Sequence, residues 1–158
     1  MPASLSLKGR ALRYLSAREH SRLELQRKLA PHAENEAEVE ALLDDFEQRG
    51  WLSTERLVAS VVHRRADRFG TARIRQELGS KGVELSQISD TLAQLQSTEF
   101  ERARAVWRRR FDAPASDPRE RARQMRFLLS RGFAADVVHR IVRDDDQHTV
   151  DPDTDASA

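Results

Sequence analysis

The sequence predicts an all-α protein made of three tandem three-helix repeats that form an elongated, curved array. Apolar residues recur three or four positions apart, as they do on one face of a helix, and the alternating Val, Ile and Thr pattern of strands is missing. Landmark residues also coincide when the chain is shifted by 49 and then by 50 positions. Units this short cannot bury an apolar face alone, so they have to stack on their neighbours.

The first repeat is expected over residues 1–52. Leu25 and Leu29 lie four apart and share a helix face, and Ser21 followed by Glu24 is typical of a capping box at a helix start. The predicted helices of this repeat cover residues 7–17, 21–30 and 36–49.

The second repeat is expected over residues 53–97. Ile74 and Leu78 repeat the four-residue spacing, while Gly70 and Gly82 fall where helices end or turn. The predicted helices here cover residues 54–69, 71–81 and 86–96.

The third repeat is expected over residues 98–143. Thr98 with Glu101 predicts a capping box, and Asp117 before Pro118 predicts a cap followed by proline at the first helical position. The predicted helices cover residues 98–111, 118–131 and 134–143. The remaining residues, 144–158, are acidic and lack aromatic side chains, so we expect them to be disordered.

The repeats also predict the core, because the apolar landmarks align between them. Leu25 aligns with Ile74, for example, and Leu78 with Leu128. Helical stripes of this kind normally face the interior. The expected core residues are Leu25, Leu29, Val39, Leu43, Phe46, Ile74, Leu78, Ile88, Leu92, Phe127, Leu128 and Phe133.

Charge is distributed unevenly although the net charge is only +1. Residues 54–143 carry 19 basic and 11 acidic side chains, whereas residues 31–50 carry seven acids and one arginine. A basic body attracts polyanions or acidic surfaces by Coulomb steering. The acidic patch at residues 34–47 and the acidic tail fit either contact with a basic partner or simple solubility.

Enzyme chemistry finds no support in the sequence. There is no cysteine, so thiolate metal sites and disulfides are excluded. The five histidines are scattered without metal-ligand spacing, and no glycine-rich phosphate loop is present. We therefore expect no catalytic residues, no metal and no cofactor. No run is apolar enough to suggest a membrane span or a secretory signal, so we expect a cytoplasmic protein.

Three motifs, in order and at repeat spacing, resemble the signatures of the RecX family. The first is residues 18–29, REHSRLELQRKL. The second combines GWLS at 50–53, RR at 64–65, FG at 69–70, RIRQEL at 73–78 and KGV at 81–83. The third is residues 126–133, RFLLSRGF. Thr54 and the Leu57-Val58 pair depart from the family pattern, but they affect only a helix start and its packing.

The resemblance implies a regulator of a RecA-type recombinase. Members of this family bind the recombinase filament on single-stranded DNA and inhibit its growth, ATP hydrolysis, strand exchange and coprotease activity. Such a protein modulates DNA repair, DNA recombination and the SOS response. We expect a monomer, and the resemblance leaves direct contact with DNA open.

Basic side chains are the candidate binding residues. Several are spaced four apart on one helix face, and arginine favours bidentate contacts with phosphate or carboxylate groups. A solvated charged face is the alternative interpretation. The candidates for contact with the recombinase or DNA are Arg64, Arg65, Arg68, Arg73, Arg75, Lys81, Arg104, Arg108, Arg109, Arg110, Arg119 and Arg123.

Two other functions fit the same composition. One is a DNA-binding protein built from helix-turn-helix-like units, without a recombinase partner. Its affinity for DNA would fall steeply with salt, because each phosphate contact releases counterions. The other is a helical scaffold unrelated to DNA, which would respond to neither ligand.

Overall fold

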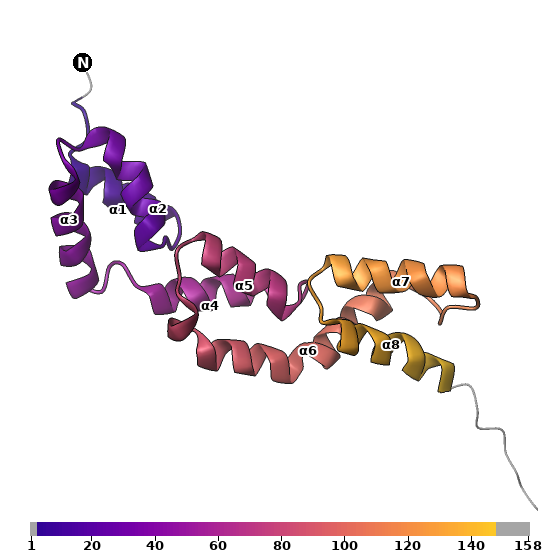
Figure 1. Ribbon diagram of the computed structural model, residues 1–158. Helices are drawn as coiled ribbons and strands as arrows, with labels where there is room; N and C mark the ends of the chain where they lie inside the picture. The colour runs from indigo at the N-terminus through magenta and orange to yellow at the C-terminus, as the bar shows by residue number, and fades with distance from the viewer. Residues whose placement is uncertain (1–2, 148–158) are drawn as a thin grey trace, which may run out of the picture. The chain divides into compact units, whose positions relative to one another are not determined.

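The computed structural model describes the backbone of residues 3–147 and the side chains of residues 3–143 (Figure 1). Every regular element in that stretch is a helix, so the all-helical prediction is confirmed. Short 3-10 helices occur at Ala30–His32 and Leu85–Gln87. The α-helices are α1 (Leu7–Ala17), α2 (Arg22–Leu29), α3 (Glu36–Gln48), α4 (Thr54–Arg65), α5 (Thr71–Ser80), α6 (Ser89–Arg110), α7 (Pro118–Ser130) and α8 (Ala135–Gln147).

Contacts divide the chain into two compact units. Unit 1 consists of residues 1–64 and 75–89, and unit 2 consists of residues 65–74 and 90–158. Helix α5 therefore begins in unit 2 and continues in unit 1.

Unit 1 contains the predicted capping box at the start of α2. The backbone N–H of Glu24 donates to Ser21 Oγ over 3.0 Å, and the backbone N–H of Ser21 donates to Glu24 Oε2 over 3.0 Å. This reciprocal pair satisfies two donors that a helix start leaves open. The cap directs α2 into a core made with α1 and α3, whose buried residues are Ala11, Leu25, Leu29, Val39, Leu43, Phe46 and Leu52.

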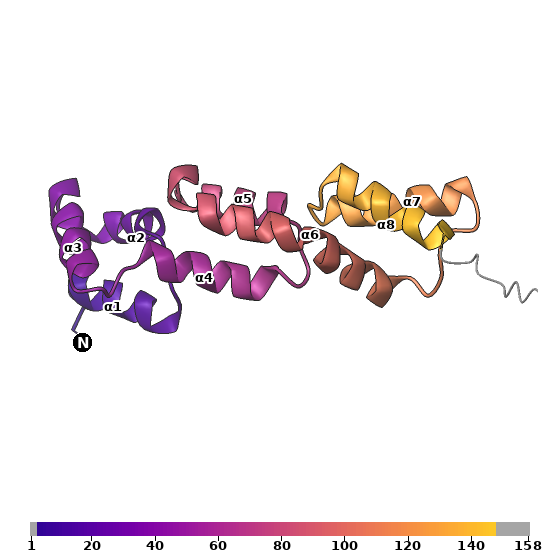
Figure 2. The same ribbon diagram turned by 90° about the horizontal axis from the view of Figure 1, so that it is seen from below.

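Unit 2 is built on α6, α7 and α8, and α7 lies beside α8 in both views (Figures 1 and 2). The predicted start of α7 is confirmed, because the backbone N–H of Glu120 donates to Asp117 Oδ1 over 2.8 Å and Pro118 opens the helix. The buried core of this unit is Ala103, Val106, Trp107, Phe111, Leu128, Phe133, Val137, Val138 and Ile141.

Helix α6 corrects the expectation of two separate helices at residues 86–96 and 98–111. It runs without interruption from Ser89 to Arg110, and Thr98 lies in its interior instead of capping a new helix. The Thr98 hydroxyl donates to the carbonyls of Gln94 and Leu95 within the same helix. A threonine that bonds back in this way loses its role as a cap. No glycine or proline lies between Ser89 and Arg110, so nothing stops the helix.

Ten of the twelve expected core residues are buried, whereas Leu92 and Phe127 are half-buried. Phe127 packs against the edge of the unit 2 core, and the guanidinium groups of Arg110 and Arg131 lie over its ring. Helix α8 continues four residues past its expected end at 143. The expected disorder of the acidic tail, from residue 148 onward, concerns residues outside the described part of the chain.

Candidate partner-binding surface

Two backbone segments touch directly in unit 2. The N–H of Gly70 donates to the carbonyl of Arg131 over 2.8 Å, and a Cβ added at Gly70 would lie 2.1 Å from the carbonyl oxygen of Gly132. Gly132 itself has φ +85°, a conformation that favours glycine. We call this contact the glycine junction. It holds the start of α5 against the end of α7, and so brings Phe69 and Arg73 next to Arg131.

Glu99 on α6 supports the glycine junction from inside. The residue is 5% exposed, and its carboxylate accepts from the backbone N–H of Thr71 over 2.7 Å and of Ala134 over 3.4 Å. Thr71 opens α5, and Ala134 directly precedes α8. A negative charge is favoured at a helix N-terminus, so one carboxylate stabilises two helix starts.

Arg102, one turn further along α6, closes the loop between α4 and α5. Its guanidinium donates to the carbonyls of Ala66 over 2.9 Å and Phe69 over 2.6 Å, and to the carbonyl of Leu95 over 2.9 Å. Burial lowers the pKa of Arg102 from its ordinary value, although the charge of Glu99 opposes this. Arginine side chains are not deprotonated in proteins, so Arg102 keeps its charge. It is half-buried and holds the Phe69 backbone in place through the carbonyl of that residue.

Arginine and phenylalanine side chains alternate across unit 2 in a continuous row. Guanidinium carbons lie over the Phe69 ring at 4.8 Å from Arg73 and 5.4 Å from Arg131. The same row continues over Phe127, at 5.1 Å from Arg131 and 5.7 Å from Arg110. It ends at Phe111, which lies 5.4 Å from Arg110 and 5.7 Å from Arg123. We call these seven residues the arginine–phenylalanine ladder: Arg73, Phe69, Arg131, Phe127, Arg110, Phe111 and Arg123.

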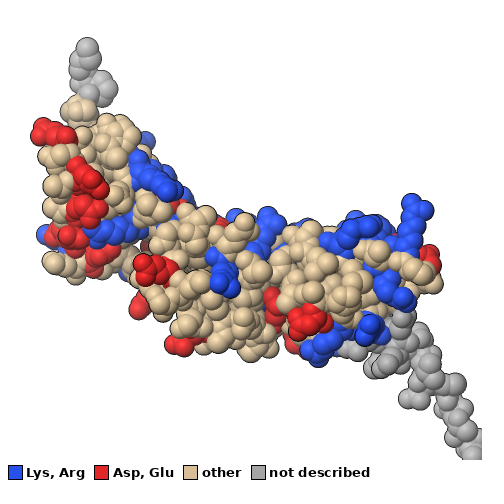
Figure 3. Space-filling model, viewed as in Figure 1, with Lys and Arg blue, Asp and Glu red and all other residues tan. Residues whose placement is uncertain are grey.

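The ladder is stabilised by cation–π attraction, which is about 0.5–1 kcal/mol per pair at exposed sites. Phe127 contacts Phe111 edge to face, with 5.4 Å between ring centroids, so the rings themselves are fixed. Arg73, Arg110 and Arg123 remain exposed to solvent although they lie over these rings. Figure 3 shows the basic side chains gathered over α7.

A cavity of about 280 Å³ opens beside the ladder. Its lining contains four arginines and the apolar residues Val106 and Phe127. Asp67 is the single acid in its lining, and its carboxylate is 4.0 Å from Arg68 with both side chains mostly exposed. The four arginines of the cavity are Arg68, Arg109, Arg110 and Arg131.

The twelve predicted binding residues fall into three groups. Five belong to the ladder or the cavity, namely Arg68, Arg73, Arg109, Arg110 and Arg123, and Arg65 adjoins them with its guanidinium 5.6 Å from the Phe69 ring. Five more lie outside both features, namely the exposed Arg64, Arg75, Arg108 and Arg119 and the half-buried Arg104. The last, Lys81, lies in unit 1 with Nζ 2.5 Å from Glu24 Oε1.

Lys81 forms part of a second junction, within unit 1. Gly82 has φ +82°, and a Cβ there would lie 2.9 Å from the Leu23 side chain. Burial alone would raise the pKa of Glu24, but hydrogen bonds from Lys81 and from the Ser21 N–H outweigh it and hold the pKa at about 2. Glu24 therefore joins the start of α2 to the turn after α5, in the way that Glu99 stabilises the glycine junction.

Arg131, Phe69 and Phe127 were not among the predicted binding residues. The sequence does contain a signal for them, since Arg65, Phe69 and Arg73 are spaced four apart, as are Arg123, Phe127 and Arg131. Glu99 could have been found as well, because it continues the four-residue spacing between the buried Leu95 and Ala103.

The acidic patch at residues 34–47 lies along α3 and is visible as the red area over that helix in Figure 3. Arg22 neutralises part of it, with 2.7 Å to Glu40, 2.7 Å to Asp44 and 3.2 Å to Glu47. Burial opposes the charge of Arg22, yet these three carboxylates raise its pKa above the ordinary value. The patch is therefore linked to α2 and contributes to the stability of unit 1.

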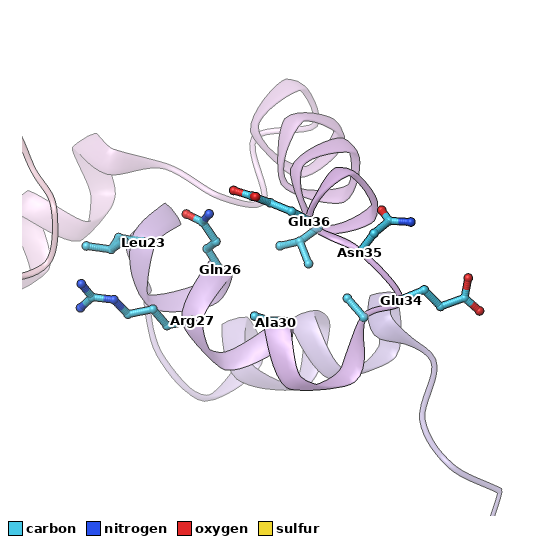
Figure 4. Close-up of a pocket in the computed structure, with 9 residues that line it drawn as sticks. Leu23, Gln26, Arg27, Ala30, Glu34, Asn35 and Glu36 are labelled. Atoms are coloured by element: carbon cyan, nitrogen blue, oxygen red, sulfur yellow. The ribbon is translucent and has the colours of Figure 1, made fainter.

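A larger cavity, of about 520 Å³, lies between α2 and the start of α3 (Figure 4). Leu23, Ala30 and Val39 make its lining partly apolar. Its rim combines Arg27 with the acids Glu34 and Glu36, so it selects neither anions nor cations by charge. Within the described residues no group of three or more His, Asp or Glu could hold a metal ion. No helix in the same stretch has the length and apolarity needed to cross a membrane.

Comparisons with known proteins agree with this architecture. The family model described as RecX, first three-helix domain, matches residues 8–46, and the model described as RecX, third three-helix domain, matches residues 97–142. Regulatory protein RecX of Leptothrix cholodnii is 66% identical over 139 residues, which cover 88% of each chain. Regulatory protein RecX of Ralstonia nicotianae is 58% identical over 139 residues, covering 88% of this chain and 87% of the relative. The chain also resembles a crystal structure of regulatory protein RecX, with a TM-score of 0.71 at 26% identity over 87% of this chain and 71% of that one.

Proposed function

Since the chain belongs to the RecX family, we propose that it binds a RecA-type recombinase assembled as a filament on single-stranded DNA and restrains that filament. The observation that supports this most directly is the arginine–phenylalanine ladder. It gives unit 2 an ordered cationic surface on the helical repeat of the family, and a nucleoprotein filament offers anions at regular intervals along its length.

The inhibition works by occupancy. A helical body held on the filament covers surface that the next recombinase protomer needs, so growth slows and disassembly prevails. Fewer assembled protomers give less DNA-dependent ATP hydrolysis, less strand exchange and less coprotease activity. The protein thereby modulates DNA repair, recombination and the SOS response, as a cytoplasmic monomer that has no catalytic activity or cofactor of its own.

Titration into a recombinase reaction tests the proposal. DNA-dependent ATP hydrolysis by the cognate recombinase on single-stranded DNA is measured while this protein is added in amounts well below one per recombinase. We expect inhibition at these low ratios, because one bound copy blocks the addition of many protomers.

Lack of inhibition at equimolar amounts, combined with tight binding to free DNA, would contradict the proposal. It would instead support the DNA-binding helical protein without a recombinase partner. Lack of response to recombinase and DNA alike would support a scaffold unrelated to DNA.

A further inference from the structure

We propose that His20 and Lys28 form an acid-sensitive latch at the corner, residues 18–21, that joins α1 to α2. The latch is closed while the His20 imidazole is neutral, and protonation of this imidazole releases Lys28 and opens the corner. The inference concerns the conformation of unit 1, so it goes beyond the proposed function and depends on no partner.

The two ring nitrogens of His20 have different partners. Nδ1 lies 3.0 Å from the carbonyl oxygen of Arg18, and Nε2 lies 2.9 Å from Nζ of Lys28. A carbonyl can only accept and an ammonium group can only donate, so Nδ1 carries the proton and Nε2 is the acceptor. The geometry therefore requires a neutral imidazole in the Nδ1–H tautomer.

The surroundings of the ring also favour its neutral form. His20 is 2% exposed, and its ring centroid lies 5.9 Å from that of Tyr14 on α1. The Lys28 ammonium group lies 4.7 Å from the centroid of the same Tyr14 ring. A neutral nitrogen and an aromatic face thus hold Lys28 in place. A second positive charge at this site would have to be buried as well, which is costly.

The charges that face His20 add to this effect. Burial lowers the pKa of His20 below its ordinary value of 6.5, and the positive charges of Arg18 and Lys28 lower it further. The hydrogen bond to the Arg18 carbonyl and the charge of Glu24 oppose the shift. Both carboxylate oxygens of Glu24 are already engaged, Oε1 by Lys81 and Oε2 by Arg18.

Protonation removes the lone pair that accepts from Lys28 and puts two positive groups 2.9 Å apart. Glu19, the next residue in the corner, is bound to Arg56 on α4 at 2.9 Å and is not free to compensate. Like charges this close repel strongly in a buried site, so the corner has to move. Because Ser21 in the corner caps α2, this movement loosens the start of that helix.

The direction of the pH effect follows from the lowered pKa of His20. The folded state binds fewer protons than the unfolded state, so the contribution of His20 to stability is complete above about pH 6.5 and is lost as pH falls below it. Ordinary carboxylates titrate lower, near about pH 4, so the two effects can be separated. Among the described residues of unit 2 the one histidine, His139, is exposed, so unit 2 serves as an internal reference.

Nuclear magnetic resonance of the full chain between about pH 5 and pH 8, where histidines titrate, tests the latch. Nitrogen chemical shifts of the His20 ring report its tautomer and its pKa. Amide hydrogen exchange at residues 18–24, corrected for the intrinsic rate, reports the opening of the corner. Lys28→Met removes the donor and its charge, and His20→Gln replaces the imidazole by an acceptor that does not titrate. The matched control, His63→Gln, removes an exposed imidazole on α4.

We expect the Nδ1–H tautomer at pH 8 and a His20 pKa below 6.5 that rises in Lys28→Met. The opening equilibrium of the corner should increase by up to about tenfold per pH unit as pH falls below 6.5, since one proton is taken up on opening. Amides of α7, in unit 2, should show no such increase. His20→Gln should abolish the pH dependence, and His63→Gln should keep it.

An Nε2–H tautomer would overturn the inference, because Lys28 could not donate to that nitrogen. Exchange at the corner that is independent of pH, or that rises equally in His20→Gln, would also overturn it. An equal rise in α7 would indicate acid unfolding of the whole chain instead of a local latch. If His20→Gln does not fold, Lys28→Met decides, since an unchanged His20 pKa in that variant would show that Lys28 is not its partner.

Discussion

Glu24 stabilises the fold through a charge that can be removed by pH. Its side-chain exposure is 17%, and it accepts hydrogen bonds from Lys81 and from the Ser21 N–H, which hold its pKa at about 2 against an ordinary value of 4.5. A carboxylate whose pKa is lowered by folding stabilises the folded state above the unfolded pKa, and this contribution is lost as pH falls. The relevant window therefore extends from about pH 4.5 down to about pH 2.

Glu24→Gln should lower the free energy of unfolding by about 1.5–3 kcal/mol at pH 7, the usual contribution of hydrogen bonds to a charged group. Glutamine can still accept from the Ser21 N–H, so the change removes the charge that pairs with Lys81 and with Arg18, whose guanidinium is 3.2 Å from Glu24 Oε2. Urea unfolding at several pH values should show the difference shrinking as pH falls through that window. Glu101→Gln, on an exposed face of α6, is the control and should have almost no effect. A difference that did not depend on pH would contradict this assignment.

The structure has no room for a side chain at Gly70. Gly70→Ala would place a Cβ 2.1 Å from the Gly132 carbonyl oxygen, so a backbone has to shift beside the Gly70–Arg131 hydrogen bond. We expect the free energy of unfolding to fall by about 3 kcal/mol, as in overpacked cores.

Gly79→Ala is the matched control, because a Cβ at that position of α5 meets nothing within 4 Å. It should stabilise the protein by up to about 1 kcal/mol, since alanine is the better helix former. Urea denaturation of both variants gives the comparison. Similar stability of the two would show that the junction tolerates a side chain.

At the scale of elements, the sequence predicted helix starts and buried faces correctly where they depend on residues three or four positions apart. Ser21 and Asp117 start helices as expected, and Leu25 and Leu128 are buried. The capping box predicted at Thr98 was wrong, because these residues cap a helix only where a new helix begins, and Thr98 lies inside α6. Nothing in the neighbouring sequence stops α6, and the buried Glu99 and the half-buried Arg102 reach their partners from one continuous helix.

Ser97→Pro tests whether α6 is continuous. In a continuous helix the proline removes a hydrogen bond and clashes with the preceding turn, which costs about 3 kcal/mol. Beside a true helix start at Thr98 the same proline would be tolerated. The free energy of unfolding in urea should therefore fall for Ser97→Pro and stay nearly constant for Ser97→Ala. A proline variant as stable as the alanine variant would restore the two-helix interpretation.

The ladder shows where prediction from sequence stops. The four-residue spacing of Arg65, Phe69 and Arg73 is visible in the sequence and could have predicted that these side chains lie close together. The meeting of Phe69 with Arg131 depends on a contact between backbones 62 residues apart in the chain, Gly70 and Gly132. A glycine has no side chain whose spacing or polarity would indicate which distant residue it contacts. The sequence therefore predicted a basic surface, but not the alternation of arginine and phenylalanine within it.

At the scale of the whole molecule, charge is separated between the acidic α3 and the arginine-rich unit 2. Arg64 and the other predicted binding residues outside the ladder stay predictions, and measurements of inhibition can test them. Reversing charge at Arg64 and Arg68 should raise the concentration needed for half-maximal inhibition of recombinase ATP hydrolysis at least about tenfold, because each reversal replaces attraction by repulsion.

The matched control reverses Arg10 and Arg13 on α1, outside the predicted set. Both pairs change the net charge equally, so only a local contact produces a difference between them. An unchanged half-maximal concentration for Arg64→Glu/Arg68→Glu would remove these two residues from the binding surface.

The exclusive use of arginine in the ladder also decides which covalent modifications can reach it. The chain has three lysines, Lys8, Lys28 and Lys81, and none belongs to unit 2. Acetylation of lysine removes a positive charge, but it has no target on this surface. Amine-directed crosslinkers would for the same reason attach through lysine only in unit 1. Chemical silencing of the ladder requires reagents, or enzymes, that act on guanidinium groups.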